Sequence, residues 1–366
     1  MSSPVPLPLP VLRPAATTPG PVADAPVADA RVTTTGPLTD RFGRVHRDLR
    51  ISLTDRCSLR CTYCMPAEGV PWIPGTDLLT TAELVRIATV AVEQAGIDEL
   101  RLTGGEPLLR ADVVDVVAAL SALRGPHGAP EVSLTTNALR LPQLASRLAD
   151  AGLTRVNISI DTLRADRFLA LTRRDRLADT LAGIAAADAA GLHPVKLNAV
   201  AMRGVNDDEL VNLVRFATER DYEMRFIEQM PLDAGHSWRR TTMVTGAEIL
   251  ERLAGAFTLT PVPGRGAAPA ERWLVDGGPG RVGVIASVSQ PFCGACDRLR
   301  LTADGQLRSC LFARTETDLR ALLRSGADDG ALVAAFRTCV AGKQPGHGID
   351  DPAFLQPDRP MSAIGG

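Results

Sequence analysis

This chain of 366 residues contains almost no lysine, and it has no large excess of acidic or basic residues. Only two of its 40 basic residues are lysines, Lys196 and Lys343, and 42 acidic residues leave a net charge of −2. A chain without a basic excess lacks the electrostatic footprint of a primary nucleic-acid-binding protein. No apolar run approaches the roughly 20 residues that a membrane-spanning helix needs. We therefore expect neither a nucleic acid nor a membrane as a partner.

The chain has seven cysteines, an odd number, and six of them form two groups of three. The start of the chain has no charged segment followed by an apolar one, so we expect no secretory signal and a reducing, cytoplasmic location. In that setting clustered thiols are metal ligands rather than disulfides. A structural zinc site normally takes four ligands, whereas each cluster supplies three. The two triplets are Cys57, Cys61 and Cys64, and Cys293, Cys296 and Cys310.

The chain divides into three parts by composition and pattern. Residues 1–38 hold nine prolines and no periodic pattern, which predicts a flexible extension. Residues 39–240 alternate short apolar runs with amphipathic stretches, which predicts about six β/α units in an open, partial TIM-like barrel. Residues 241–366 lose this rhythm and predict a smaller α+β region that closes the open side and ends in a loose tail at 361–366. The predicted strands of the barrel are 49–53, 100–103, 132–135, 156–160, 195–200 and 224–227.

The first triplet has the spacing C-x3-C-x2-C and directly follows the first predicted strand. Three thiolates so spaced can hold three irons of a [4Fe–4S] cluster and leave the fourth iron free to bind a small molecule. A zinc site completed by a distant ligand, or unrelated buried cysteines, are the alternatives. In parallel α/β folds, ligands bind at the carboxyl ends of strands, and glycine-rich or polar residues recur there. They include the segment 104–107 (Gly-Gly-Glu-Pro), Ser159 and Met230.

The second triplet has the spacing C-x2-C-x13-C and again lacks a nearby fourth cysteine. It predicts either a second cluster with an open iron or a four-ligand site whose last ligand is distant. Arg298 and Arg300 follow Cys296 two residues apart, so they share one face of an extended segment. Two guanidinium groups beside a cluster suit a polyphosphate, although such a pair is also common on solvated surfaces.

The first triplet, with Tyr63 inside it, and the Gly-Gly-Glu-Pro segment resemble the radical S-adenosylmethionine enzymes. The resemblance narrows at residues 292–302, continues through 304–305 and 307–311, and includes the terminal Ile-Gly-Gly and Phe-Gly-Arg at 42–44. Together these segments resemble the GTP 3′,8-cyclase family of molybdenum-cofactor biosynthesis, over about residues 40–366. Matching motifs at both triplets, the glycine loop and the tail make this resemblance specific.

The resemblance implies two [4Fe–4S] clusters, one on each triplet, with S-adenosylmethionine on the open iron of the first and GTP near the second. It implies that the Gly-Gly tail, Gly365 and Gly366, enters the active site with Arg298 and Arg300 as catalytic groups. It implies S-adenosylmethionine contacts from Tyr63, Gly105, Ser159 and Met230. It implies GTP contacts from Arg50, Arg101, Thr135, Lys196, Arg298, Leu299 and Arg300.

The implied reaction joins C3′ and C8 of GTP by radical chemistry to give 3′,8-cyclo-7,8-dihydro-GTP. The implied partners are a flavodoxin- or ferredoxin-type electron donor and the downstream cyclic pyranopterin monophosphate synthase, and a homodimer is allowed. Another radical S-adenosylmethionine enzyme with an auxiliary cluster, such as a peptide-modifying one, is an alternative. A non-catalytic, zinc-stabilised binding protein is an alternative of a different class. Cys339 matches no ligand position and is expected to be buried in a helix.

Overall fold

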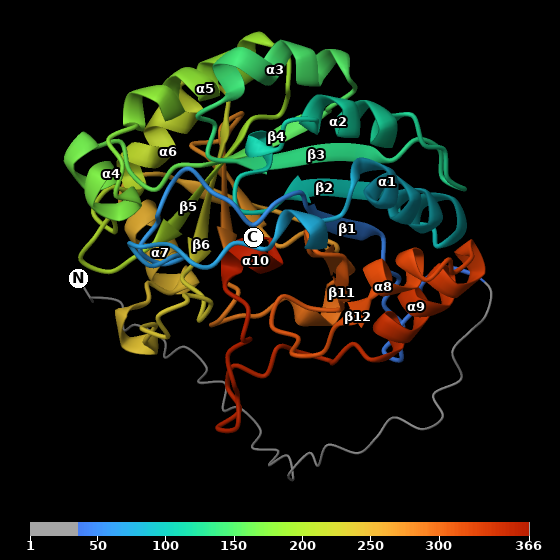
Figure 1. Ribbon diagram of the computed structural model, residues 1–366. Helices are drawn as coiled ribbons and strands as arrows, with labels where there is room; N and C mark the ends of the chain where they lie inside the picture. The colour runs from blue at the N-terminus through green and yellow to red at the C-terminus, as the bar shows by residue number, and fades with distance from the viewer. Residues whose placement is uncertain (1–35, 366) are drawn as a thin grey trace, which may run out of the picture. The chain divides into compact units, whose positions relative to one another are not determined.

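The computed structural model describes residues 36–365 of the chain. The predicted extension lies outside this range except for its last three residues, of which Leu38 is buried against the core. The described part contains one sheet of 12 strands in the order β12-β11-β10-β1-β2-β3-β4-β5-β6-β9-β8-β7. Its central strands are joined by helices that cover one face of the curved sheet (Figure 1).

Six parallel strands form the expected partial barrel. They are β1 Asp48–Ser52, β2 Glu99–Thr103, β3 Glu131–Thr136, β4 Arg155–Ser159, β5 Lys196–Ala201 and β6 Glu223–Glu228, each hydrogen-bonded to the next. The connecting helices are α1 Thr81–Thr89, α2 Val113–Ser121, α3 Leu141–Asp150, α4 Ala165–Thr172, α5 Leu177–Ala189 and α6 Leu210–Thr218. Short turns of helix are η1 Gly75–Asp77, η2 Val90–Gln94, η3 Pro107–Leu109, η4 Arg240–Thr242 and η5 Cys293–Ala295. The predicted α/β partial barrel is thus confirmed.

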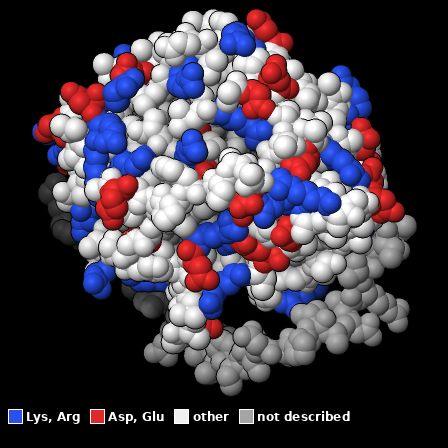
Figure 2. Space-filling model, viewed as in Figure 1, with Lys and Arg blue, Asp and Glu red and all other residues white. Residues whose placement is uncertain are grey.

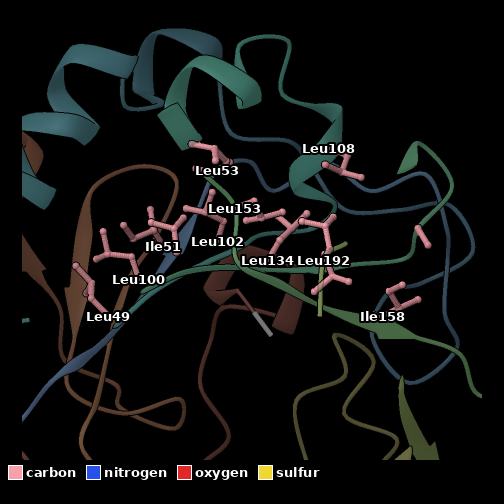
Figure 3. Packing of buried hydrophobic residues seen from close by; sticks show 14 of the residues in the cluster. Leu49, Ile51, Leu53, Leu100, Leu102, Leu108, Leu134, Leu153, Ile158 and Leu192 are labelled. Carbon is pink, nitrogen blue, oxygen red and sulfur yellow. The ribbon is translucent and has the colours of Figure 1, made fainter. Parts of the chain in front are cut away.

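Local sequence explains how these elements form. Thr80 and Glu83 make the reciprocal bonds of a capping box at the start of α1, which then buries Leu84 and Ile87. In β1, Leu49 and Ile51 are fully buried on the helix-facing side, as strand alternation requires. Figure 3 shows these two side chains beside Leu100 and Leu102 of β2. The intervening residues of each strand therefore face the inside of the barrel, where they are available to a ligand.

The C-terminal region extends the same sheet at both edges instead of forming a separate one. β9 Arg281–Ile285 pairs in parallel with β6, and β10 Arg298–Leu301 pairs in parallel with β1. The other strands are β7 Leu259–Val262, β8 Glu271–Val275, β11 Gln306–Arg308 and β12 Thr317–Asp318, and the helices are α7 Gly246–Ala254, α8 Leu319–Arg324, α9 Asp329–Ala341 and α10 Met361–Ile364. The boundary predicted at residue 240 thus falls within one continuous sheet.

The tail is not loose, and this expectation was wrong up to Gly365. Met361 to Ile364 form α10, and Ile364 is buried because its apolar side chain packs inside the fold. The Ser52 hydroxyl at the end of β1 donates to the Ile364 carbonyl at 3.1 Å. Figure 1 shows α10 in the middle of the strands. Gly366 lies outside the described residues. Cys339 is buried in α9, as predicted.

The surface of the described part carries acidic and basic side chains in mixture. Figure 2 shows the two signs interspersed on the face in view, without a large area of one sign. None of the helices in residues 36–365 combines the length and apolar character needed to cross a lipid bilayer.

Candidate active site

A cavity of about 290 Å³ lies inside the barrel, enclosed by strand residues, the loops at their carboxyl ends and the start of α10. It collects residues that are far apart in sequence, from β1 to Ser362. The candidate site residues that line it are Arg50, Cys57, Cys61, Tyr63, Cys64, Arg101, Gly105, Thr135, Ser159, Met230, Arg298 and Arg300. The structure therefore brings most of the sequence-derived candidates together around one space.

The first triplet lies on the loop that leaves β1. Burial raises the pKa of the Cys57 thiol to about 11 and that of Cys64 to about 12, and burial with Asp161 and the neighbouring cysteines raises the pKa of Cys61 well above its usual range. Three half-buried thiols whose surroundings disfavour free thiolates fit a site where iron neutralises the negative charge, because metal-bound cysteines are deprotonated. Asn137 Nδ2 lies 3.9 Å from Cys57 Sγ. The donor set thus suits a [4Fe–4S] cluster with one open iron.

The two glycines at the end of β2 are required by a close backbone approach. A Cβ on Gly104 would collide with the Thr54 carbonyl, and one on Gly105 would collide with the Arg56 carbonyl. Gly104 also has φ +141°, a conformation that few other residues adopt. Gly105 N and Glu106 N donate to the carbonyls of Thr54 and Arg56, each at 2.7 Å. The glycine loop therefore locks onto the segment that leads into the first triplet.

Glu106 organises this end of the barrel from a fully buried position, and the sequence reasoning did not assign it a role. Its carboxylate accepts from the Thr136 hydroxyl and from Asn137 N, both at 2.7 Å, and from Leu108 N at 3.0 Å. Burial outweighs these bonds and raises its pKa to about 6. Because it joins the ends of β2 and β3, Glu106 positions Asn137 beside Cys57.

Asp161, to which the sequence likewise assigns no role, joins the end of β4 to β5. It accepts from the Tyr63 hydroxyl at 2.8 Å and from Val200 N at 2.9 Å. Burial raises its pKa to about 6 despite these bonds. Tyr63, which lies inside the first triplet, is thereby fixed to the far strand. A carboxylate shortly after a predicted strand was the available sequence signal for both Glu106 and Asp161.

Three arginines lie side by side on adjacent parallel strands. Arg300 of β10 is in register with Arg50 of β1, which is in register with Arg101 of β2. Each points into the barrel, since the residues that flank it in its strand are buried on the opposite face. Among residues 36–365, Arg50 reaches a carboxylate only at 3.9 Å, on Asp48, and its Nε has no hydrogen-bond partner there. The row is therefore a set of two buried cations and one nearly buried cation, with few counter-charges among residues 36–365.

The pKa values of these arginines show that the row has little compensating negative charge among the described residues. Burial, and next the charge of Arg101, lower the pKa of Arg50 well below its usual value. Burial likewise lowers the pKa of Arg300 to about 10. Like charges that are buried together are unfavourable unless an anion joins them. Guanidinium groups in a row match the oxygens of a polyphosphate, so the row is suited to a nucleoside triphosphate.

The second triplet lies next to the cavity but does not line it. Phe292, Arg298 and Leu311, which neighbour the three cysteines in sequence, do line it. Burial would raise the pKa of Cys296, but the charges of Arg298 and Lys343 outweigh it and lower the pKa. Cys293 has a raised pKa because of burial and the nearby Cys310. This site therefore stabilises a thiolate at Cys296, as a metal ligand requires.

Within residues 36–365, no three Cys, His, Asp or Glu side chains converge on a point where one metal ion could bind. A [4Fe–4S] cluster does not require such convergence, because each thiolate binds a different iron of the cube. Both triplets thus have donors of the kind that an iron–sulfur cluster takes.

Three remaining candidate residues do not line the cavity. Leu299 points into the hydrophobic core and is fully buried, so its side chain is not available to a ligand. Lys196, at the start of β5, lies outside the cavity lining. Its pKa is lowered to about 7 by burial and by the nearby Arg225 and Arg155. Gly365 accepts a hydrogen bond from Arg300 at the end of the row.

Comparison with known proteins agrees with this arrangement. The radical SAM superfamily model matches residues 51–217, and the model described as Molybdenum Cofactor Synthesis C matches residues 222–349. SuiB of Streptococcus suis, solved with its precursor peptide SuiA, shares the fold with a TM-score of 0.55 at 14% identity, over 81% of this chain and 68% of that one.

Sequence relatives are much closer. The GTP 3′,8-cyclase of Streptomyces coelicolor is 60% identical over 331 residues, which cover 90% of this chain and 96% of that protein. GTP 3′,8-cyclase 2 of Mycobacterium bovis is 58% identical over 346 residues, which cover 93% of this chain and 95% of that protein. The chain belongs to the GTP 3′,8-cyclase family of the radical SAM superfamily.

Proposed function

We propose that this protein is a GTP 3′,8-cyclase that converts GTP to (8S)-3′,8-cyclo-7,8-dihydroguanosine 5′-triphosphate, the first step of molybdenum-cofactor biosynthesis. Membership of the radical SAM superfamily implies a [4Fe–4S] cluster and S-adenosylmethionine as cofactors. When bound, these cofactors would supply the radical that removes the 3′ hydrogen of GTP; C3′ would then bond to C8, and uptake of one electron and one proton would complete the 7,8-dihydro product.

The observation that carries the proposal is the row of Arg300, Arg50 and Arg101. The three guanidinium groups extend into the barrel from neighbouring strands, and the first triplet lines the same cavity. A triphosphate held by this row would be oriented by several charge-assisted hydrogen bonds at once. Such fixed orientation is what a reaction between two atoms of one substrate needs from its enzyme.

The chain's other residues have supporting roles in this proposal. Cys57, Cys61 and Cys64 would hold the first cluster, and its open iron would take S-adenosylmethionine. Tyr63, Gly105, Ser159 and Met230 line the cavity and would contact that cofactor. Thr135 and Arg298 also line it and would contact GTP with the arginine row. The buried α10 would help to exclude water, which protects radical intermediates from side reactions.

The remaining parts of the proposal rest on the resemblance and on the second triplet. Cys293, Cys296 and Cys310 would hold a second [4Fe–4S] cluster, whose open iron would meet the guanine. Leu299 would contribute through its backbone and Lys196 through its charge, and the Gly365–Gly366 tail would reach the substrate. A flavodoxin- or ferredoxin-type protein would supply electrons in the cytoplasm. Cyclic pyranopterin monophosphate synthase would take the product.

The test is an anaerobic incubation of cluster-loaded protein with GTP, S-adenosylmethionine and a reductant. We expect 5′-deoxyadenosine and a cyclised nucleotide, both detected by mass spectrometry. Replacing Arg50 by methionine removes a charged hydrogen-bond donor that is worth about 1.5–3 kcal/mol, so kcat/KM for GTP should fall roughly 10- to 100-fold.

Arg220→Met is the matched control, because Arg220 is an exposed arginine paired with its neighbour Glu219. It should leave kcat/KM unchanged. Absence of the cyclised nucleotide from wild-type protein with both clusters loaded would reject the proposed activity. An Arg50→Met variant with unchanged kcat/KM would reject the role of the arginine row.

A further inference from the structure

Lys343 is a buried lysine in a chain that uses arginine almost everywhere else. It follows the end of α9 and is only 3% exposed. Its Nζ donates to the Arg298 carbonyl at 2.6 Å and to the Ser309 carbonyl at 2.7 Å, and lies 3.7 Å from Cys296 Sγ. These partners match the three N–H donors of an ammonium group. Among residues 36–365, none of its hydrogen-bond partners is a carboxylate.

The three partners belong to the two segments that carry the second triplet. Arg298 lies two residues after Cys296, and Ser309 immediately precedes Cys310. One ammonium group therefore ties together the parts of the chain on which two of the three cysteines stand. A compact ammonium can bond to three acceptors grouped around it, whereas a planar guanidinium directs its donors outward in a fork. This geometry explains why arginine does not replace lysine here.

A second buried cation supports the third cysteine through the neighbouring backbone. Arg44 donates to the Cys293 carbonyl at 2.7 Å and to the Gln344 carbonyl at 2.8 Å, and pairs with Asp40 at 2.5 Å. Gln344 directly follows Lys343, so Arg44 binds the same turn of chain that carries Lys343. Each cysteine of the second triplet is thus held close to a buried positive charge or to a backbone that such a charge fixes.

We infer that Lys343 is a positioning residue for the second cluster, acting through Cys296. Its hydrogen bonds hold the cysteine-bearing segments at the spacing that the cluster needs, and its charge stabilises the negative charge on the ligand sulfur. Hydrogen bonds and charges at the sulfurs set the reduction potential of such clusters. The ammonium therefore raises the potential, because the added electron of the reduced cluster is stabilised by a nearby positive charge. This inference rests on the second cluster of the proposed function.

The experiment measures the second cluster alone. In a full-length protein in which Cys57, Cys61 and Cys64 are replaced by alanine, we expect about four irons per chain after anaerobic reconstitution with iron and sulfide. Adding Lys343→Met should lower the midpoint potential in an EPR-monitored redox titration and should speed iron loss to a chelator several-fold. Lys343→Arg keeps the charge, so it should restore most of the potential but not the slow iron loss.

The matched control places Lys343→Met in a chain whose second triplet is replaced by alanine. There the first cluster should keep its wild-type potential. If Lys343→Met does not fold, Lys343→Gln carries the same test, since it keeps an N–H donor and loses the charge. A potential and an iron-loss rate that do not depend on residue 343 would overturn this inference alone. A Lys343 protein that binds no iron at the second triplet would overturn the second cluster and the inference together.

Discussion

The two cysteine triplets lie in opposite electrostatic surroundings. The first is close to buried carboxylates, with Asp161 raising the pKa of Cys61 and Glu106 raising that of Cys57, each in addition to burial. The second is close to buried cations, which lower the pKa of Cys296 although burial opposes them. Cluster potentials depend on nearby charge, so in the proposed function a cluster on the first triplet should be harder to reduce than one on the second.

The same contrast separates the two ends of the cavity. The carboxylates near the first triplet are held by backbone and hydroxyl donors and join neighbouring strands. The arginines near the second triplet are crowded and have few partners, as Arg50 shows. A site that stores uncompensated positive charge is prepared for an anionic ligand. In the proposed function, this difference would place the polyanionic substrate on the side of the second triplet and the more strongly reducing cluster on the first.

The sharpest way to break this comparison is to remove one triplet at a time. Replacing Cys61 by alanine should abolish both 5′-deoxyadenosine formation and cyclisation, because S-adenosylmethionine is cleaved at the first cluster in the proposed reaction. Replacing Cys296 by alanine should abolish cyclisation but leave measurable 5′-deoxyadenosine. Product analysis by mass spectrometry and iron content per chain measure both effects. Cys339→Ala is the control, since Cys339 is buried in α9 and should leave both products unchanged.

If both cysteine variants lost 5′-deoxyadenosine to the same extent, the two triplets would not have separate roles. The contrast in their surroundings would then concern stability of the fold and not chemistry.

The sequence predicted the side of the first triplet much better than the side of the second. Cys57, Tyr63 and Gly105 are close to regular β/α units, so local periodicity places them at strand ends. The pairing of β10 with β1 joins segments that are about 250 residues apart, and such a contact leaves no periodic signal in either strand. The row formed by Arg300 and Arg50 could therefore not be derived from spacing alone.

Other features could not be predicted from the residues alone, because their contacts come from distant parts of the chain. The tail contains two glycines, which normally indicate a loose terminus, and only the family resemblance implies that it enters the active site. Its burial depends on Ser52 and Arg300, two residues from distant strands. The sequence marks Glu106 only as part of the Gly-Gly-Glu-Pro segment, and only the fold reveals that its carboxylate joins β2 to β3.

A smaller effect tests whether the C-terminal tail links the surroundings of the two cysteine triplets. Gly365 has φ +86°, and a Cβ there would meet Ser52 Oγ and lie 2.6 Å from Thr103 Oγ1, while its carbonyl accepts from Arg300. Gly365→Ala should displace α10, lower the free energy of unfolding by about 1–3 kcal/mol and reduce kcat/KM roughly 10-fold or more. Thermal unfolding and steady-state kinetics measure these changes.

Gly326→Ala is a suitable control for Gly365→Ala. Gly326 also has a positive φ, +82°, but a Cβ there meets no atom of the described residues within 4 Å. It should carry the backbone cost without the loss of activity. Equal losses of kcat/KM in the two variants would show that the tail affects only stability.

The smallest expected effect tests whether the positive charge that binds substrate extends from the arginine row to Lys196 on β5. Lys196 has a pKa near 7 because of burial and the charges of Arg225 and Arg155, well below the value of about 10.4 in an unfolded chain. A depressed lysine pKa means that its contribution to stability is present above about pH 10 and is lost as pH falls through 7, where the buried amine must take up a proton.

Nucleotide binding should show the opposite trend, because a triphosphate prefers the charged form of Lys196. The Kd for GTP should therefore rise between pH 7 and pH 9, by at most about 10-fold per unit, as the amine loses its proton. Lys196→Arg keeps its charge throughout this range, so its Kd should be nearly constant, and any titration of GTP itself is common to both proteins. Equilibrium binding at several pH values measures the two slopes. Equal slopes would confine the substrate-binding charge to the strands around β1 and exclude β5, whereas a steeper wild-type slope would extend it across the barrel.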